Sequence, residues 1–382
     1  MPIRQPFASE RIQLTDPLTG IKVIQITSYP TPSVHLMYDW PSITPDNERV
    51  VFLSQRWTQR SAPWDLYRCD TDGLGLFQLT ERDEKAGHPS VVMSLDGKTV
   101  YAVWREEYLL CTVDVETGAT TELMDLRPYC PEEHVLSGIR IGGMGRRLFV
   151  SFLSYTKGGG RSLGIDLESG KLTQYEGDMG IMACDQSSNR LIVVRNYQKL
   201  GTKKAANGSR VLMNANPEPM TLWSIDEERG DEQYIATVDM FGHSTMLGRT
   251  NKIQGTGQPP HRCIWIAEAG KEPYKLVEGP YFWHSGASFD GEWILSDTNW
   301  PDEGLQLIHV PTRHFRTLCH AHARQEHSQF GHPHPALSQD GRVAVFNSDR
   351  TGVAQVYLAH ITEEFREGVK AGVLDNPKDK WI

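Results

Sequence analysis

The sequence predicts an all-β fold, a seven-bladed β-propeller, from two observations. One pattern recurs four times: a small residue or proline, an alternating apolar stretch, Asp followed by Gly or Asn, and a second apolar stretch. In addition, seven units, roughly 40 to 60 residues apart, can be marked along the 382 residues. Four-stranded units of about this length are typical of propeller blades.

The recurring segments predict two hairpins in each unit. The first type occupies 41–52, 89–101, 286–295 and 335–346. Its Asp-Gly or Asp-Asn pair supplies the positive φ angles that a tight turn between two strands needs. A second hairpin follows at 67–77, 113–122 and 165–173. Two hairpins give four antiparallel strands, which is one blade.

The units begin near His35, His88, His134, Gly180, His243, His284 and His332. Segment 16–26 has the pattern of a second hairpin but precedes the first unit, and the last unit lacks an outer strand. We therefore expect an N-terminal strand to join the last blade and close the ring. The chain 1–382 is predicted as one propeller domain, with an insertion in blade four at about 196–219 and a helical tail at 362–382.

Composition excludes several classes of protein. The chain is 39% hydrophobic and 23% charged, as in ordinary folded domains, and no apolar run approaches the roughly 20 residues of a membrane span. The net charge is −9 and no basic stripe stands out, which argues against nucleic-acid binding. The N-terminus lacks the apolar region of a signal peptide, and the six cysteines are scattered, so we expect a cytoplasmic protein.

Most units begin with a histidine. His35, His88, His134, His243 and His284 each start one unit, and the last unit brings both His332 and His334. The inner strands of a propeller begin on one face, around the central channel. The histidines are therefore expected to converge on one funnel.

The densest histidine cluster precedes the last unit and suggests a metal site. His332 and His334 would lie on one face of a strand, since side chains alternate along it. Gln329 lies three residues earlier, and His284 begins the neighbouring blade. Three imidazoles and one carbonyl oxygen would suit Mn, Fe, Co, Ni or Zn. Alternatively, His-Pro-His-Pro is a stiff segment leading into a strand, with solvated histidines.

The spacing Gln329-x-x-His332-Pro-His334-Pro, with His284-Ser-x-x-Ser-Phe-Asp-Gly about 45 residues earlier, resembles the metal site of the oligogalacturonate lyases. These are cytoplasmic seven-bladed propellers of pectin catabolism. The resemblance implies that His284, Gln329, His332 and His334 hold Mn²⁺. It also implies that His243 lines the catalytic centre and that the partner is an acidic oligosaccharide.

The sequence departs from that family at the catalytic arginine, which stands two residues before a tryptophan. Here the tryptophan is Trp223 and the residue two before it is Thr221. Either Arg210 or Lys204 of the insertion supplies the cation, or the proton-abstracting group differs. Arg210 could clamp a carboxylate with two hydrogen bonds, although the sequence context favours a solvated cation in a loop.

Three further residues are candidates for substrate binding. His35 and His88 would reach sugar hydroxyls or carboxylates from blades one and two, or would simply line a wet channel. Arg56 lies beside Trp57 and Trp64, a combination that suits sugar stacking and carboxylate pairing.

Three functions fit these observations. The first is a metal-dependent lyase that cleaves short uronate oligomers by β-elimination. The second is a non-enzymatic binding propeller, similar to periplasmic translocation proteins or to the sensor domains of peptidases. The histidine and glutamine cluster argues against it, because a scaffold does not need those residues. The third is a metal-dependent hydrolase or epimerase on the same fold.

Overall fold

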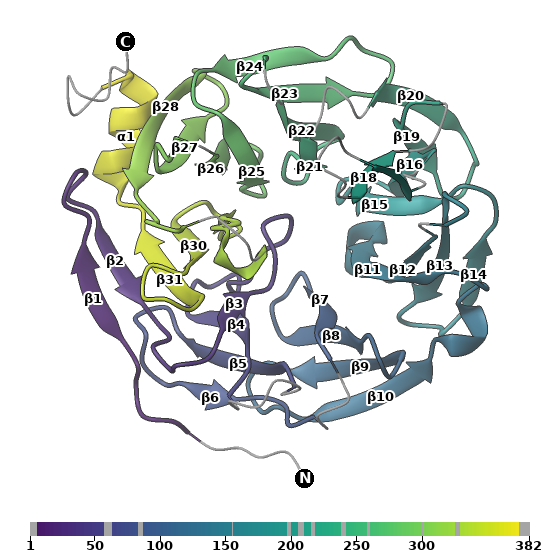
Figure 1. Cartoon of the computed structure of the whole chain (residues 1–382), viewed down its shortest axis with the longest axis horizontal. Coiled ribbons are helices and arrows are strands. Elements are labelled where there is room, and N and C mark those ends of the chain that lie inside the picture. Colours follow the sequence, from purple (N-terminus) through teal and green to yellow (C-terminus); the bar gives the residue numbers. More distant parts are fainter. Residues whose placement is uncertain are drawn as a thin grey trace.

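Seven β-sheets of four or five strands form a ring in the computed structural model of the chain (Figure 1). The structure describes residues 6–56, 63–82, 87–154, 156–196, 200–204, 210–214, 218–237, 242–257, 260–299, 301–324 and 329–373. Neighbouring strands within each sheet are antiparallel, and each sheet is one blade. The predicted seven-bladed propeller is confirmed.

The blades follow the chain. Blade one contains β3 (Ser33–His35), β4 (Arg49–Ser54), β5 (Asp65–Asp70) and β6 (Phe77–Gln78). Blade two contains β7 (Pro89–Met93), β8 (Thr99–Trp104), β9 (Leu109–Asp114) and β10 (Thr120–Asp125). Blade three contains β11 (Val135–Gly142), β12 (Arg147–Leu153), β13 (Gly160–Asp166) and β14 (Leu172–Tyr175). Blade four contains β15 (Gly180–Cys184), β16 (Arg190–Arg195), β19 (Thr221–Asp226) and β20 (Glu232–Thr237). Blade five contains β21 (Gly242–Met246), β22 (Lys252–Gly257), β23 (Cys263–Glu268) and β24 (Tyr274–Glu278). Blade six contains β25 (Phe282–Ala287), β26 (Trp293–Thr298), β27 (Leu305–His309) and β28 (His314–Cys319).

The seventh blade unites the two ends of the chain. It contains β29 (Ala336–Leu337), β30 (Val343–Ser348), β31 (Gln355–His360), β2 (Lys22–Gln25) and β1 (Ile12–Thr15). β2 pairs antiparallel with β31, so that Val23 lies opposite Ala359 and Gln25 opposite Tyr357. The N-terminal hairpin therefore supplies the outer two strands of the blade that the C-terminal strands begin.

Blade four carries the inserted hairpin. β17 (Leu200–Lys204) and β18 (Arg210–Asn214) pair with each other as a separate two-stranded sheet between β16 and β19.

The repeated turn has one hydrogen-bond design. In the turn between β7 and β8, the Ser94 hydroxyl donates to Asp96 Oδ1 at 2.6 Å, and the same oxygen accepts the Lys98 N–H. Gly97 takes the left-handed φ of 71° that the turn requires. Equivalent hydroxyl-to-carboxylate bonds occur at Thr44 to Asp46, Ser288 to Asp290 and Ser338 to Asp340. The turn also has its backbone bond, from the Gly97 N–H to the Ser94 carbonyl oxygen at 3.0 Å, so the recurring sequence pattern is a turn in which side-chain bonds reinforce the backbone bond.

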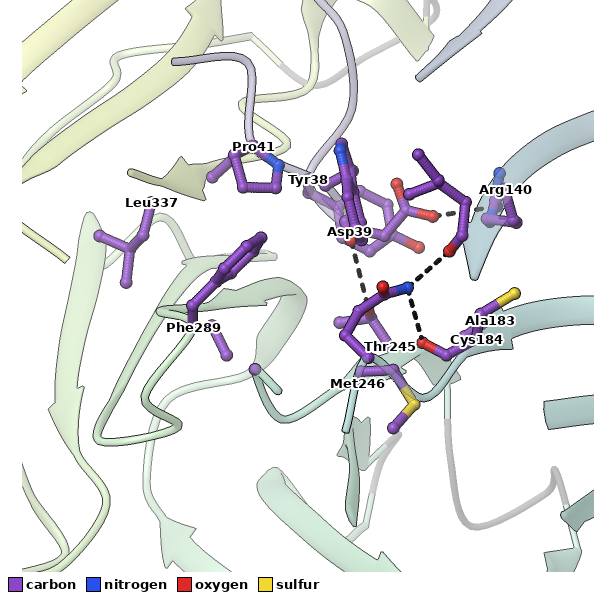
Figure 2. Close-up of a pocket in the computed structure, with 16 residues that line it drawn as sticks. Tyr38, Asp39, Pro41, Arg140, Ala183, Cys184, Thr245, Met246, Phe289 and Leu337 are labelled. Carbon is purple, nitrogen blue, oxygen red and sulfur yellow. Dashed lines mark hydrogen bonds and ion pairs between the residues drawn. The ribbon is translucent and has the colours of Figure 1, made fainter. Parts of the chain in front are cut away.

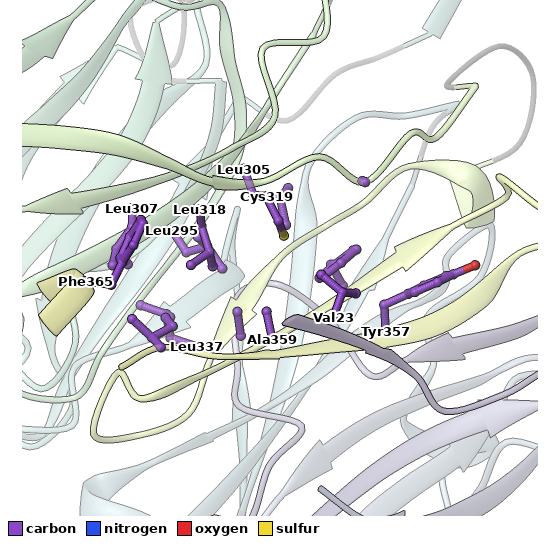
Figure 3. Packing of buried hydrophobic residues seen from close by; sticks show 14 of the residues in the cluster. Val23, Leu295, Leu305, Leu307, Leu318, Cys319, Leu337, Tyr357, Ala359 and Phe365 are labelled. Atoms are coloured by element: carbon purple, nitrogen blue, oxygen red, sulfur yellow. The ribbon is translucent and has the colours of Figure 1, made fainter. Parts of the chain in front are cut away.

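The hydrophobic core lies between neighbouring blades. The cluster between blades six and seven contains Leu295 and Leu307 on one side, and Val23, Tyr357 and Ala359 on the other (Figure 3). All five are 3% exposed or less. Burial of a large apolar side chain contributes about 1.5–3 kcal/mol, so these layers hold the blades face to face.

A single α-helix, α1 (Glu363–Ala371), occurs within the described residues and covers the edge of this cluster. The Thr362 hydroxyl accepts the Phe365 N–H at its start, and Gly372 ends it in the left-handed conformation. The expected helix of the tail is therefore present at 363–371. No helix among the described residues has the length and apolar character needed to cross a membrane.

The N-terminal hairpin of β1 and β2 is fixed to blade six by the buried carboxylate of Asp16. Its oxygens accept the N–H groups of Leu18 and Thr19 at 2.9 Å and of His320 at 2.6 Å. Burial raises the pKa of the Asp16 carboxyl, but the hydrogen bonds from the His320 ring and from these N–H groups outweigh it, so the pKa lies well below its usual value.

We expect Asp16→Asn to lower the free energy of unfolding at pH 7 by about 1–3 kcal/mol, because the N–H groups of Leu18, Thr19 and His320 lose their charged acceptor. A depressed carboxyl pKa stabilises the fold above the unfolded-state pKa of about 3.9, and this contribution is lost as the pH falls toward the folded-state pKa. The difference in the free energy of unfolding between wild type and variant should therefore become smaller below about pH 4. Urea unfolding followed by tryptophan fluorescence measures it.

The matched control is Asp125→Asn, since that carboxylate is exposed and pairs with Arg127. A gap that stayed constant from neutral to acidic pH would contradict the role of Asp16.

Candidate metal centre

Three histidines from two blades meet at the centre of the ring. His284 lies on β25, and His332 and His334 lie in the segment before β29. Each offers one ring nitrogen, and the three nitrogens all lie within 4.8 Å of one another. The ring centroids of His284 and His334 are 4.1 Å apart. Three converging imidazoles form a donor set that fits a divalent transition metal.

A β-bulge aims His284 at this point. The pairing of β25 with β26 shifts register between Phe282 and Ser285, so that Trp283 and His284 together lie opposite Asp297. A bulge of this kind re-aims a side chain. The pairing of β21 with β22 shifts in the same way between Gly242 and Thr245, around His243. The inner strands of blades five and six thus present their histidines by the same device.

The pair before β29 is arranged differently from the sequence prediction. His332 and His334 were expected on one face of a strand, but β29 begins only at Ala336. Both rings come from the preceding loop, and their centroids are 5.5 Å apart. His334 has a left-handed φ of 45°, which a residue with a side chain adopts only where its surroundings hold it.

The carboxylate of Asp297 connects the two blades. It is 1% exposed and accepts the His284 N–H at 2.6 Å, the His284 Nδ1 at 2.9 Å and the His334 N–H at 3.3 Å. Because Nδ1 of His284 donates to a carboxylate, its Nε2 carries the lone pair for a metal. Asp297 was not among the sequence candidates. Its signal was a charged residue within the apolar strand Trp293–Thr298, which must find partners when buried.

His284 and His334 border a cavity of about 310 Å³. Its polar lining consists of His35, Tyr38, His88, His243, His284, Gln329, His334 and Asn347, together with apolar residues such as Phe330. Five of the histidines that mark unit starts or the last pair are thus gathered in one place. Gln329 belongs to the short 3-10 turn Gln329–Gly331 and lines the same cavity.

His35 and His88 lie on the blade-one and blade-two side of the cavity. The buried ring of His35 lies with Nδ1 3.2 Å from Ser42 Oγ, and the backbone N–H of His35 donates to Asn347 Oδ1 at 3.0 Å. The His88 ring stacks on Phe330, with centroids 5.4 Å apart. The bond to Asn347 links blade one to β30, and the stacking on Phe330 links blade two to the segment that carries Gln329.

Burial lowers the pKa of four of these imidazoles, those of His35, His88, His243 and His334. Burial lowers the pKa of His35 and of His88 to about 4 each. Desolvation, and after it the neighbouring His284, lowers the pKa of His243 to about 4. Burial also holds the pKa of His334 well below 6.5. At neutral pH these four rings are uncharged, and for His334 this is the form that binds metals.

Three other sequence candidates lie elsewhere or are only partly described. The guanidinium of Arg56 pairs with Glu10 and lies over the rings of Phe7, Tyr29 and Tyr67, with 8% of its side chain exposed. His134 is not among the described residues that line the cavity. The Nδ1 atom of His134 lies 2.9 Å from the Glu132 carbonyl oxygen. Arg210 begins β18, and its side chain lies outside the described part of the structure.

Blade four has an arginine opposite Thr221. The Thr221 hydroxyl accepts the Trp223 Nε1–H at 3.0 Å, and Arg195 is the register partner of Thr221 on β16. The Arg195 guanidinium lies 4.9 Å from the centroid of Trp223 and pairs with Glu232 at 2.6 Å. The cation beside this tryptophan thus comes from the neighbouring strand.

No protein-family model and no curated protein matches the sequence. Among solved structures, the chain is similar to an oligogalacturonate lyase in complex with manganese, with a TM-score of 0.75 and 16% identity over 96% of this chain and 100% of the other. An oligogalacturonate lyase from Vibrio parahaemolyticus has a TM-score of 0.73 and 16% identity, over 95% and 99% of the two chains. The RRP9 WD40 repeats give 0.56 and 9% identity, over 94% and 100%. At these identities the likeness shows a shared fold.

We expect Asp297→Ala to weaken divalent-metal binding by about 10- to 100-fold, because His284 and His334 lose the acceptor that orients them. Isothermal titration with Mn²⁺ measures the change. Asp290→Ala removes a turn carboxylate of the same blade and should leave the affinity unchanged. Equal affinity of Asp297→Ala and wild type would contradict the role given to Asp297.

Proposed function

We propose that the chain is a metal-dependent lyase that cleaves short oligogalacturonate-like uronate oligosaccharides by β-elimination. The observation that carries the proposal is the convergence of His284, His332 and His334, with the Asp297 carboxylate behind them, beside a cavity of about 310 Å³. The fold shared with two oligogalacturonate lyases, one in complex with manganese, supports it. We propose Mn²⁺ as the cation and Gln329 as its fourth protein ligand.

The reaction removes a weakly acidic proton. In a uronic acid residue, C5 carries a hydrogen and the carboxylate, and C4 carries the glycosidic oxygen. The C5 hydrogen leaves as a proton, the C4–O bond breaks, a C4–C5 double bond forms, and the departing oxygen takes up a proton. A bound divalent cation would neutralise the carboxylate and stabilise the negative charge that develops as the C5 proton leaves.

His243 is the proposed group for proton transfer. Its ring centroid lies 4.3 Å from that of His284, and its side chain is exposed at the cavity surface. An imidazole in this place can hold or release a proton beside the carbon next to the carboxylate. The bulge around His243 keeps the ring turned toward the ligand histidines.

His35 and His88 are proposed to bind the sugar from the other side of the cavity. Phe330, stacked on His88, offers an apolar face to a sugar ring. Arg210 of the inserted hairpin is proposed as a second cation for a uronate carboxylate.

The proposal is tested first on metal content and product. Purified protein incubated with Mn²⁺ should hold about one ion per chain, and incubation with oligogalacturonate should give the ultraviolet absorbance of a 4,5-unsaturated product. His332→Ala should lose both, since only two imidazoles remain. His314→Ala is the matched control, because that ring binds the Lys370 carbonyl oxygen on the outside.

A metal-free wild type would favour a binding propeller over an enzyme. Bound metal without the ultraviolet signal would favour the hydrolase or epimerase, or another substrate.

We expect His243→Ala to keep the metal and to lower kcat about 10²- to 10⁴-fold, with a small change in KM, because the ring transfers a proton but does not ligate. Steady-state kinetics and metal analysis of the same sample separate the two effects. Loss of the metal together with activity would make His243 a ligand instead.

A further inference from the structure

A loop from blade one reaches toward the centre of the ring and contacts the candidate metal site (Figure 1). Residues 36–43 connect β3 to the turn before β4, and the loop lies near the centre of the ring (Figure 1). Met37 and Trp40 form an antiparallel bridge, so that Tyr38 and Asp39 lie at the tip of a tight turn.

The tip of the loop is anchored to several other blades. Arg140 of β11 pairs with the Asp39 carboxylate at 2.9 Å, and the Thr245 hydroxyl of β21 donates to the Asp39 carbonyl oxygen at 3.5 Å (Figure 2). Trp40 Nε1 donates to the Met93 carbonyl oxygen of β7 at 2.7 Å. Blades two, three and five therefore fix a segment that belongs to blade one.

This anchored tip places the Tyr38 ring against the histidines. Its centroid lies 5.3 Å from that of His284, 5.8 Å from that of His334 and 6.4 Å from that of His243. The rings of Tyr38 and His334 are stacked, with 17° between their planes. Tyr38 lines both the 310 Å³ cavity and a second cavity of about 40 Å³ that contains Asp39 and Arg140. The loop thus lies between the two spaces.

Gly286 gives the loop the room it needs. A Cβ atom at Gly286 would lie 2.4 Å from the Tyr38 carbonyl oxygen and 3.3 Å from the Pro335 carbonyl oxygen. Backbone oxygens cannot turn aside as a flexible side chain does. The absence of a side chain two residues after His284 therefore allows the loop and the last histidine segment to approach β25.

We infer that loop 36–43 sets the geometry of the metal site, with Tyr38 as a positioning residue for His334. The stacked ring supports a histidine whose left-handed backbone needs its surroundings to hold it. The ring carries this role, and the hydroxyl does not. The inference rests on the metal binding of the proposed function.

The test is Mn²⁺ titration calorimetry on the full chain with Tyr38→Ala, Tyr38→Phe and Gly286→Ala. Tyr38→Ala and Gly286→Ala should each weaken binding about 10- to 100-fold, as changes behind metal ligands do. Tyr38→Phe keeps the ring and should bind within about twofold of wild type, a rescue that tells positioning from general destabilisation. Tyr274→Ala is the matched control, since that ring lies on β24 over Arg313.

Thermal unfolding of the metal-free variants shows whether each is folded, and Gly286→Ala tests the loop even if Tyr38→Ala does not fold. Tyr38→Ala and Gly286→Ala that bind Mn²⁺ like wild type would overturn the inference while the proposed function stands. A wild type that binds no Mn²⁺ would overturn both.

Discussion

The candidate site depends on one buried carboxylate. Asp297 accepts two N–H groups from His284 and one from His334, and it lies opposite the bulge that turns His284 inward. An isolated charge at 1% exposure would be very costly, so the carboxylate is retained only because these donors surround it. The same bonds fix which nitrogen of His284 faces the centre. Blade six and the segment before blade seven are thereby joined by a single side chain.

The propeller makes this arrangement possible by bringing distant segments to one axis. Each inner strand begins near the channel, and the bulges in β21 and β25 turn His243 and His284 into it. The ring also lets a loop of blade one reach β7, β11 and β21 at once. In an open sheet, long loops would be needed to bring these segments into contact, whereas in a closed ring the segments already lie close together around the channel. The apolar layers between the blades keep the blades in fixed positions, and these positions in turn fix the polar groups at the centre.

Much of the fold could be read from the sequence, and only part of the site. The Asp-Gly turns and the unit length predict the blades because the turn chemistry is local, as the Ser94 to Asp96 bond shows. The convergence of His284, His332 and His334 followed from where units begin. Strand periodicity did not explain the His332 and His334 pair, because a loop with a left-handed residue brings them together. Asp297 and Tyr38 were missed since their roles depend on contacts between segments that no local pattern records. Arg56 was predicted to bind sugar from its residue type, but its guanidinium pairs with Glu10.

The pairing of β2 with β31 sets an order of events during synthesis. The Val356 N–H donates to the Thr27 hydroxyl at 3.0 Å, and these residues are 329 positions apart in the chain. At translation rates of about 5–20 residues per second, the first hairpin waits some tens of seconds for its partner strand. Its unpaired edge is open to other chains in that time, and so distant a pairing closes slowly. The ribosome therefore releases the histidines of the last segment almost together with β31, the strand that closes the ring, and a nascent chain has no complete centre before β31 has been made.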